Sequence, residues 1–208
     1  SRGLGAVYKR QVNGVNSNED SYRLTDRFLF TLEYAIIYRK YLLPAKCQHP
    51  KKVGRYIKMK LTILGTGNAK VTKCYNTCFA LNEDKEYFMI DGGGGNTILK
   101  QLEDAGISWK EIRTIFVTHK HIDHLLGIIW MLRMYCQGMA RGQFGGEVTI
   151  YGHDEVISLL KQMAEMLLTP KETKFIGDKV HLEEVKDGED RTILGHLSLI
   201  HISEPTRR

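Results

Sequence analysis

Four side chains able to bind a metal ion fall within six residues, in the stretch Thr-His-Lys-His-Ile-Asp-His that ends at His124. Side chains alternate along an extended segment, so His119 and His121 point to the same side and both imidazoles can reach one metal ion. Asp123 and His124 follow the turn into a helix and point toward a second position. One loop could thus supply ligands to two metal ions ~3.5 to 4 Å apart, the spacing of two-metal hydrolytic centres. Imidazole and carboxylate ligands together suit Zn²⁺, with Mn²⁺ or Fe as alternatives.

The alternative interpretation of this loop is purely structural. Histidines in a polar loop can cap a helix or face solvent, and a single histidine would favour that reading. Four potential ligands at this spacing favour a metal site instead. Asp91 precedes four glycines. Taken by itself, this pattern is that of an ordinary aspartate in a turn after a strand.

Alternating strands and helices are predicted around the loop, as in a layered α/β domain. Apolar and β-branched runs predict strands, the first of them buried, at residues 60–64, 77–81, 87–90, 113–117, 147–151 and 179–185. Helical spacing of apolar residues predicts helices at 96–105, 123–136 and 153–168. Ser108 and Glu111 have the spacing of a capping box. The loop of histidines therefore joins a strand to the N-terminus of a helix, which favours anions.

The pattern His-x-His-x-Asp-His after an apolar strand resembles the metallo-β-lactamase-fold hydrolases, with Asp91-x-Gly one strand earlier and Leu64-Gly-Thr-Gly at the domain start. The resemblance extends from residue 59 to about residue 196. Within that superfamily the sequence resembles the ribonuclease Z branch, the tRNA 3′-processing endonucleases, through Gly-Thr-Gly, Asn76-Thr and the glycines after Asp91. It departs from the branch at Ile122, usually glycine, and at Gly94, usually acidic.

The resemblance implies an α/β fold that forms the N-terminal half of an αββα sandwich. It assigns His119 and His121 to the first metal ion, Asp123 and His124 to the second, and makes Asp91 a buried carboxylate that steadies the loop. The family completes its site with a third histidine, a bridging aspartate and a further histidine later in the chain. His196 is a candidate for the third histidine, but Leu-Gly before it is typical of an exposed turn. We therefore expect two ligands for each metal ion within this sequence.

The implied chemistry is hydrolysis by a hydroxide activated at a dinuclear zinc site, with Asp123 as a catalytic residue. The implied substrate is RNA, a tRNA precursor cut near its 3′ end by a phosphodiesterase of endoribonuclease type. The branch is typically homodimeric. Two alternatives stay open. One is a hydrolase of the same fold acting on a small anionic ester, namely a phosphodiester, thioester or lactone. The other is a non-catalytic metal-binding domain.

Composition limits the remaining classes. The 208 residues, 42% of them hydrophobic, suffice for one domain with a core. No apolar run reaches the ~18 to 20 residues of a membrane span, so no membrane partner is expected. Four cysteines and no recognisable secretory signal favour a cytoplasmic protein. The net charge of +6 combines +9 in the flanking residues 1–58 and 197–208 with −3 in residues 59–196, so overall charge is no argument for nucleic-acid binding.

The two ends of the sequence differ from its middle. Residues 1–11 and 197–208 resemble translated sequencing-adapter DNA, which predicts that neither end was selected for folding. Residues 12–58 are then either translated upstream DNA or an additional helix, for which the apolar spacing in residues 25–43 is suitable. The predicted domain is residues 59–196, a fragment that is incomplete on its C-terminal side.

Overall fold

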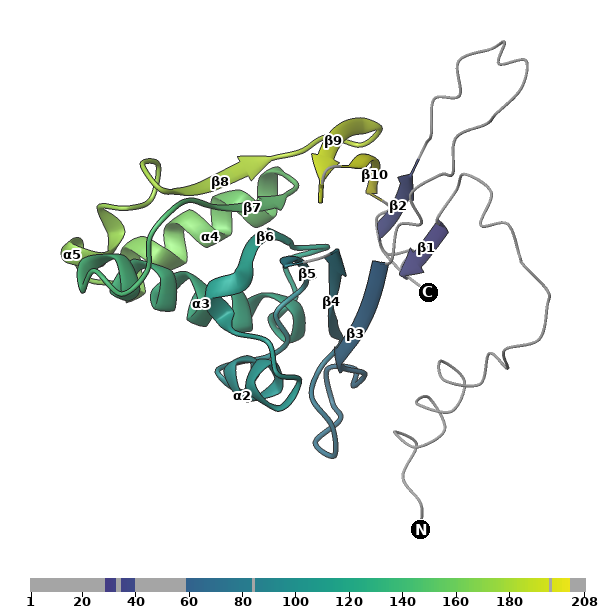
Figure 1. Ribbon diagram of the computed structural model, residues 1–208, viewed down its shortest axis with the longest axis horizontal. Coiled ribbons are helices and arrows are strands. Elements are labelled where there is room, and N and C mark those ends of the chain that lie inside the picture. The colour runs from purple at the N-terminus through teal and green to yellow at the C-terminus, as the bar shows by residue number, and fades with distance from the viewer. Residues whose placement is uncertain (1–28, 33–34, 40–58, 84, 195, 203–208) are drawn as a thin grey trace.

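A six-stranded sheet forms the larger part of the computed structural model, which describes residues 29–32, 35–39, 59–83, 85–194 and 196–202 (Figure 1). Its strands, in spatial order, are β3 (Met59–Gly65), β4 (Cys78–Glu83), β5 (Glu86–Ile90), β6 (Ile112–Phe116), β7 (Val148–Gly152) and β8 (Val180–Glu184). The first three strands pair antiparallel, and β5 to β8 pair parallel. Parallel neighbours need a long crossover, and each crossover here contains a helix.

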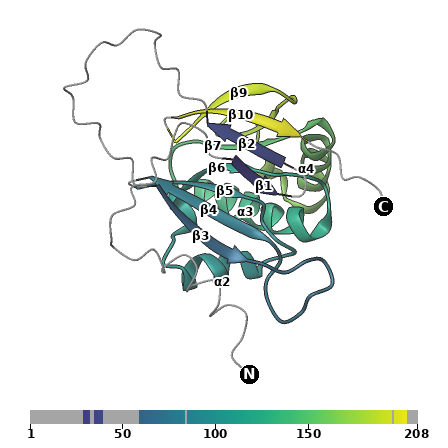
Figure 2. The ribbon, with the colours of Figure 1, turned by 90° about the vertical axis from the view of Figure 1, so that its right-hand side faces the viewer.

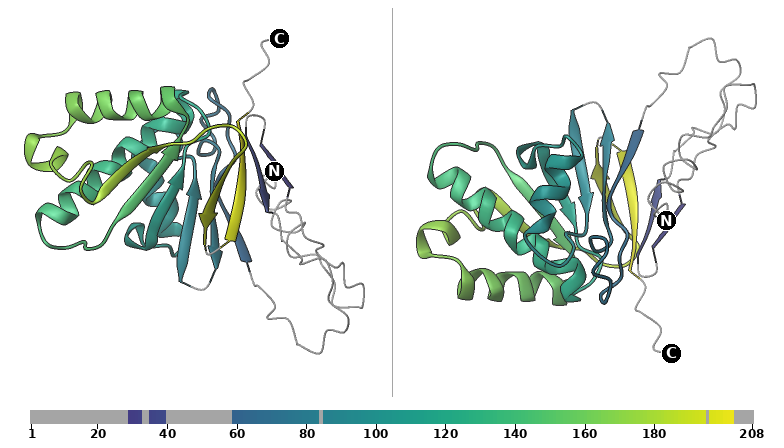
Figure 3. Two further views of the ribbon diagram at one scale, coloured as in Figure 1. Left: turned by 90° about the horizontal axis from the view of Figure 1, so that it is seen from above. Right: turned by 90° about the horizontal axis from the view of Figure 1, so that it is seen from below.

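The helices cover one face of this sheet (Figure 3). They are α2 (Thr97–Asp104), α3 (Ile122–Ala140), α4 (Asp154–Leu167) and α5 (Pro170–Thr173), with a 3₁₀ turn at Trp109–Glu111. Leu125, Ile128 and Leu132 recur at helical spacing in α3 and are fully or almost fully buried in the main core. The capping box is confirmed, because the Ser108 amide donates to the Glu111 carboxylate at 3.0 Å and the Ser108 hydroxyl accepts from the 3₁₀ turn.

A second, four-stranded sheet lies on the other face, in the order β1-β2-β10-β9 (Figure 2). Its strands are β1 (Leu29–Leu32), β2 (Ala35–Arg39), β9 (Glu189–Ile193) and β10 (His196–Ile202). Ile193 of β9 joins an apolar cluster with Phe79, Phe88 and Phe116 of the larger sheet. Helices, sheet and second sheet therefore follow one another as layers. The predicted α/β fold, part of an αββα sandwich, is confirmed.

The first predicted strand is present, but the prediction that it is buried was wrong. β3 pairs with β4 alone and forms an edge of the sheet. Leu61 and Ile63 in it are 37% and 46% exposed. An apolar run predicts a strand, but burial depends on which layer covers each face, and that is a tertiary property.

The alternative of an additional helix over residues 25–43 does not agree with the structure, because the described parts of this stretch are the strands β1 and β2. β-Branched and aromatic residues such as Ile36, Ile37 and Tyr38 favour strands, and β2 pairs with β10, more than 150 residues away. The sequence predicts no strand after residues 179–185, whereas the structure has β9 and β10 there. β10 crosses the predicted boundary after His196. The adapter-like residues 1–11 lie outside the described residues, and the three-part division of the chain stays a prediction.

Candidate metal centre

The loop of histidines lies at the carboxyl end of β6, between the ends of β5 and β7. Asp91 follows β5, Thr118 and His119 follow β6, and His153 follows β7. These three strands are parallel neighbours, so their carboxyl ends meet at one edge of the sheet. Ligands in open α/β sheets bind outside this edge.

Among the helices of the described residues, none is long and apolar enough to cross a bilayer.

The structure places the four predicted ligands near one another, although no three of them form a group that could by itself hold a metal ion. The ring centroid of His119 lies 4.6 Å from that of His121 and 4.0 Å from that of His124. The Asp123 carboxylate lies 3.5 Å from Nε2 of His124. His119 is buried, Asp123 and His124 are partly exposed, and His121 is exposed. The group therefore opens to solvent on the side of His121.

Asp91 holds this loop from beneath and is only 2% exposed. Its carboxylate accepts the backbone N–H of Thr118 at 2.8 Å, the Thr118 hydroxyl at 2.8 Å and Nδ1 of His124 at 2.7 Å. Its backbone has φ +58°, a left-handed conformation that aspartate adopts more readily than most residues. The carboxylate thus links the end of β5 to both ends of the loop.

These contacts determine which nitrogen of each histidine is available. Nδ1–H of His124 donates to Asp91, which leaves Nε2 for a metal ion. The single hydroxyl proton of Thr118 is donated to Asp91, so this oxygen accepts Nδ1–H of His119 at 2.9 Å. Nε2 of His119 is then the unprotonated nitrogen as well. This assignment follows from the hydrogen-bond network.

The pKa values of His119 and His124 are shifted in opposite directions. Burial, together with the neighbouring His124 and His121, lowers the pKa of His119 to about 4, so this imidazole is neutral at pH 7. Burial also opposes protonation of His124, but its hydrogen bond to Asp91 and the charges of Asp91 and Asp123 outweigh it, and the pKa of His124 is raised. A metal ion binding to His124 would therefore displace its proton more readily as pH rises.

The glycine turn after Asp91 supports the same loop. The Gly92 amide donates to the His124 carbonyl at 2.8 Å, and the Gly127 amide donates to the Gly93 carbonyl at 2.9 Å. A Cβ at Gly127 would overlap the Gly92 carbonyl, so only glycine allows α3 to approach the turn this closely.

Tyr75, from the loop between β3 and β4, makes hydrogen bonds to the backbone of this glycine turn. Its hydroxyl lies 2.8 Å from the carbonyl of Gly92 and 2.7 Å from that of Gly95, and it accepts the Gly95 amide at 3.2 Å. Burial raises the pKa of Tyr75, so the phenol keeps its proton for this role. The sequence analysis missed Tyr75, Thr118 and Gly127. Thr118 borders the motif, whereas nothing local marks the other two.

His196 is not placed with the four ligands. It begins β10 in the second sheet, opposite Ile193, and its side chain lies outside the described residues. His153 caps α4 without a side-chain capping bond, lies 3.3 Å from the Asp154 carboxylate and contributes to the low pKa of His119. Within the described residues, no three or more His, Cys, Asp or Glu side chains form a group that could hold a metal ion.

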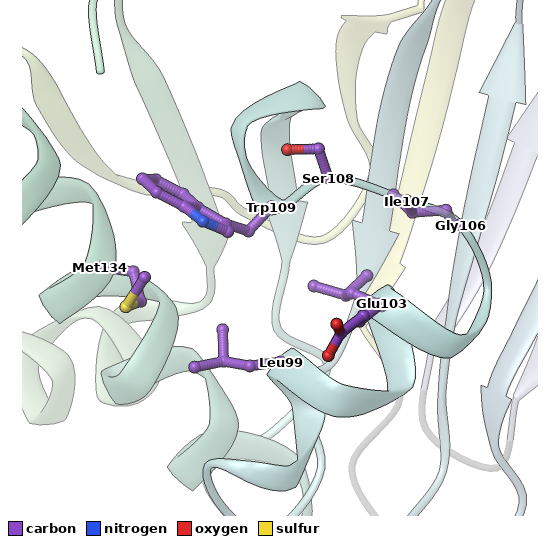
Figure 4. Close-up of a pocket in the computed structure, with 8 residues that line it drawn as sticks. Leu99, Glu103, Gly106, Ile107, Ser108, Trp109 and Met134 are labelled. Carbon is purple, nitrogen blue, oxygen red and sulfur yellow. The ribbon is translucent and has the colours of Figure 1, made fainter. Parts of the chain in front are cut away.

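Two cavities of the described residues differ in character. An open, polar cavity of about 510 Å³ is lined by the β3–β4 loop, the glycine turn and the first turns of α2. An apolar cavity of about 460 Å³ is lined by Leu99 of α2, by Trp109 of the 3₁₀ turn and by Met134 of α3 (Figure 4). Glu103 is the one titratable side chain that lines the apolar cavity, and none of the four predicted ligands reaches it. None of the four predicted ligands lines the polar cavity either, which approaches their loop at Gly94.

Comparison with known proteins identifies the family to which this chain belongs. Residues 59–200 match the family model described as "Anti-Pycsar protein Apyc1", which is more than half of the chain. The chain belongs to the Apyc1 family. The match covers the six-stranded sheet, all four predicted ligands and β9, and reaches into β10.

Curated relatives of this Apyc1 family member include ribonucleases Z, which confirms the resemblance found in the sequence. Ribonuclease Z of Methanothermobacter thermautotrophicus is 42% identical over 76 residues, 36% of this chain and 24% of that protein. Ribonuclease Z of Nitrosopumilus maritimus is 30% identical over 131 residues, 60% of this chain and 43% of that protein. The chain thus spans roughly a quarter to two fifths of the length of these relatives.

Two solved structures are also similar. Human tRNase Z, short form, has a TM-score of 0.43 at 24% identity and covers 51% of this chain and 38% of that one. A diphosphatase from the PhnP family has a TM-score of 0.49 at 19% identity and covers 67% of this chain and 60% of that one.

Proposed function

We propose that this chain carries part of the active site of a metal-dependent hydrolase of phosphodiesters. The observation that supports it is the Asp91 network. One buried carboxylate, acting directly and through Thr118, holds two imidazoles by Nδ1, so that Nε2 is the ring nitrogen each of them turns away from Asp91. Histidines that bind metal ions in proteins commonly donate their other ring nitrogen to a carboxylate or another oxygen in this way.

The donor set suits zinc, with Mn²⁺ or Fe as alternatives. His119 and His121 would hold one ion, and Asp123 and His124 a second. Each pair supplies two ligands, and further ligands would come from elsewhere. Metal ions bound there would lower the pKa of water toward neutrality and stabilise negative charge on a phosphoryl group.

The chain's own residues prepare the site. Asp91 and Thr118 fix the imidazole tautomers, and the low pKa of His119 keeps its Nε2 lone pair available near pH 7. Asp123, our proposed catalytic residue, presents its carboxylate beside His124. α3 begins at Ile122, so the positive end of its backbone dipole lies at the loop and favours an anionic substrate.

We propose RNA, as a tRNA precursor cut near its 3′ end, as the substrate. The similarity to ribonucleases Z supports this. A small phosphodiester is the second candidate. It is supported by the charge of −3 on residues 59–196, which provides no overall attraction for polyanionic RNA. The three described cysteines are free thiols, which agrees with a proposed cytoplasmic location. A homodimer is likewise our proposal.

The decisive experiment compares Asp123→Asn with Asp178→Asn, a matched control at an exposed aspartate between α5 and β8. Zinc binding is measured by titration calorimetry, and hydrolysis of a chromogenic phosphodiester is measured in a version extended to the relatives' length. Asp123→Asn should weaken zinc binding and abolish hydrolysis, while Asp178→Asn changes neither. Hydrolysis that survives Asp123→Asn would remove the proposed mechanism, and cleavage of a tRNA precursor against a cyclic dinucleotide separates the two substrates.

A further inference from the structure

The polar cavity beside the loop of histidines has a lining that the metal chemistry does not use. Its volume is about 510 Å³, within the range of ~300 to 1,000 Å³ found for small-molecule sites. Two segments form its walls, the β3–β4 loop and the glycine turn with the first turns of α2. The side chains and backbone that matter here are those of Lys73, Tyr75, Asn76, Gly94, Thr97 and Gln101.

The lining favours an anionic, hydrogen-bonding ligand. Lys73 is the one charged side chain in it, and no carboxylate opposes that charge. Asn76 and Gln101 add amide groups, which pair well with the polar edges of nucleotides. The Asn76 amide nitrogen donates to the Asn68 carbonyl at 3.1 Å, so the orientation of this side chain is set before a ligand arrives.

The cavity shares a wall with the predicted ligands. A Cβ at Gly94 would lie 3.7 Å from Cα of Asp123 and 2.5 Å from the Asn76 side-chain oxygen. Gly94, which lines the cavity, therefore lies next to the backbone of Asp123, and the hydroxyl of Tyr75 contacts the neighbouring Gly95. A ligand in the cavity would lie on the side of Gly94 where this loop begins its helix.

We propose that this cavity, here called the Lys73 cavity, binds a phosphorylated nucleoside: the nucleotide unit of the substrate next to the bond that is cut. Its phosphate lies near Lys73, and its ribose or base lies against the amides of Asn76 and Gln101. The proposal rests on the proposed function, because a phosphodiester substrate brings such a unit to the loop. It adds a binding site on the side of the β3–β4 loop, distinct from the metal ligands.

The test is binding of 5′-AMP to the full chain in the presence of EDTA, followed by ¹H–¹⁵N NMR. The chelator removes metal ions, so phosphate cannot be captured by the loop of histidines. AMP should shift the amides of Gly94, Gly95 and Thr97 saturably. Inorganic phosphate should shift the same amides more weakly, and adenosine should bind more weakly than AMP, because each carries only part of the ligand.

Two lysine variants provide the comparison. Lys73→Ala should weaken AMP binding about tenfold, the loss of one hydrogen bond to a charged group. Lys70→Ala removes an exposed lysine of the same loop that does not line the cavity, and should leave binding unchanged. The spectrum of each variant reports directly whether it is folded.

Three results would overturn the proposal: no saturable shift at these amides, equal AMP binding by wild type and Lys73→Ala, or adenosine binding as tightly as AMP. The outcome is separate from that of the proposed function. AMP binding in EDTA, combined with zinc binding that Asp123→Asn does not alter, would keep the Lys73 cavity and remove the metal mechanism. The reverse combination would keep the metal mechanism alone.

Discussion

Replacing Asp91 by asparagine removes a charge from the centre of the loop without changing the size of the side chain. Asp91 accepts three donors, the amide and hydroxyl of Thr118 and Nδ1 of His124. Asparagine has one acceptor oxygen, and its NH₂ group would face a donor. The loss of one charge-assisted hydrogen bond in a buried site costs about 1.5 to 3 kcal/mol of unfolding free energy.

The pKa of His124, whose Nδ1 donates to this carboxylate, gives a more specific measure of the role of Asp91. The pKa of His124 is raised because contacts with Asp91 and Asp123 outweigh burial. In Asp91→Asn burial and Asp123 remain, so the pKa of His124 should fall, as an NMR titration of its ring would show. A histidine with a raised folded-state pKa stabilises the fold at pH values below its unfolded pKa, and this is lost as pH rises through the folded pKa. The destabilisation should therefore be larger at pH 5.5 than at pH 8.

Zinc affinity should fall as well, by about 10- to 100-fold, the usual effect of removing a carboxylate that orients a metal-binding histidine. Titration calorimetry on Asp91→Asn measures this, and the exposed Asp178→Asn is the control for loss of one negative charge. If Asp91→Asn leaves both the His124 pKa and the zinc affinity as in wild type, the orienting role of Asp91 is refuted.

Four further results are expected. Tyr75→Phe should lower the urea midpoint by the equivalent of about 1 to 3 kcal/mol, since buried carbonyls lose their donor, whereas Tyr87→Phe should not. Gly127→Ala should give a thermal midpoint well below that of Gly145→Ala, whose Cβ meets open space; equal midpoints would contradict the close approach of α3. The pKa of His119, about 4, lies below its unfolded value, so the free energy of unfolding should fall by about 3 kcal/mol from pH 6.5 to pH 4. His119→Gln should make the free energy of unfolding, measured by urea titration, depend less on pH. Equilibrium dialysis of this chain should find fewer than two tightly held zinc ions, and two would contradict the expected two ligands per ion.

Local patterns predicted most of the central domain. The alternation of strands and helices from β3 to β8, the capping box at Ser108 and the position of the ligand loop all follow from residues close in the chain. Residues within a few positions of each other share a face or a turn whatever the rest of the molecule does. For the same reason the grouping of His119, His121, Asp123 and His124 could be predicted from spacing.

The contacts between residues far apart in the sequence depend on the tertiary structure alone. Asp91 contacts Thr118 and His124 across 27 and 33 residues, and Tyr75 reaches Gly95 across 20. These contacts exist because β5 and β6 are neighbours with their carboxyl ends together and because the β3–β4 loop folds back over the glycine turn. The pairing of β2 with β10 depends on the same kind of long-range register. Sequence by itself determined the ligand types, their spacing and the α/β pattern. Only the packed sheet decided which nitrogen each histidine offers and where the Lys73 cavity lies, because hydrogen bonds between remote residues depend on strand order, which no local periodicity encodes.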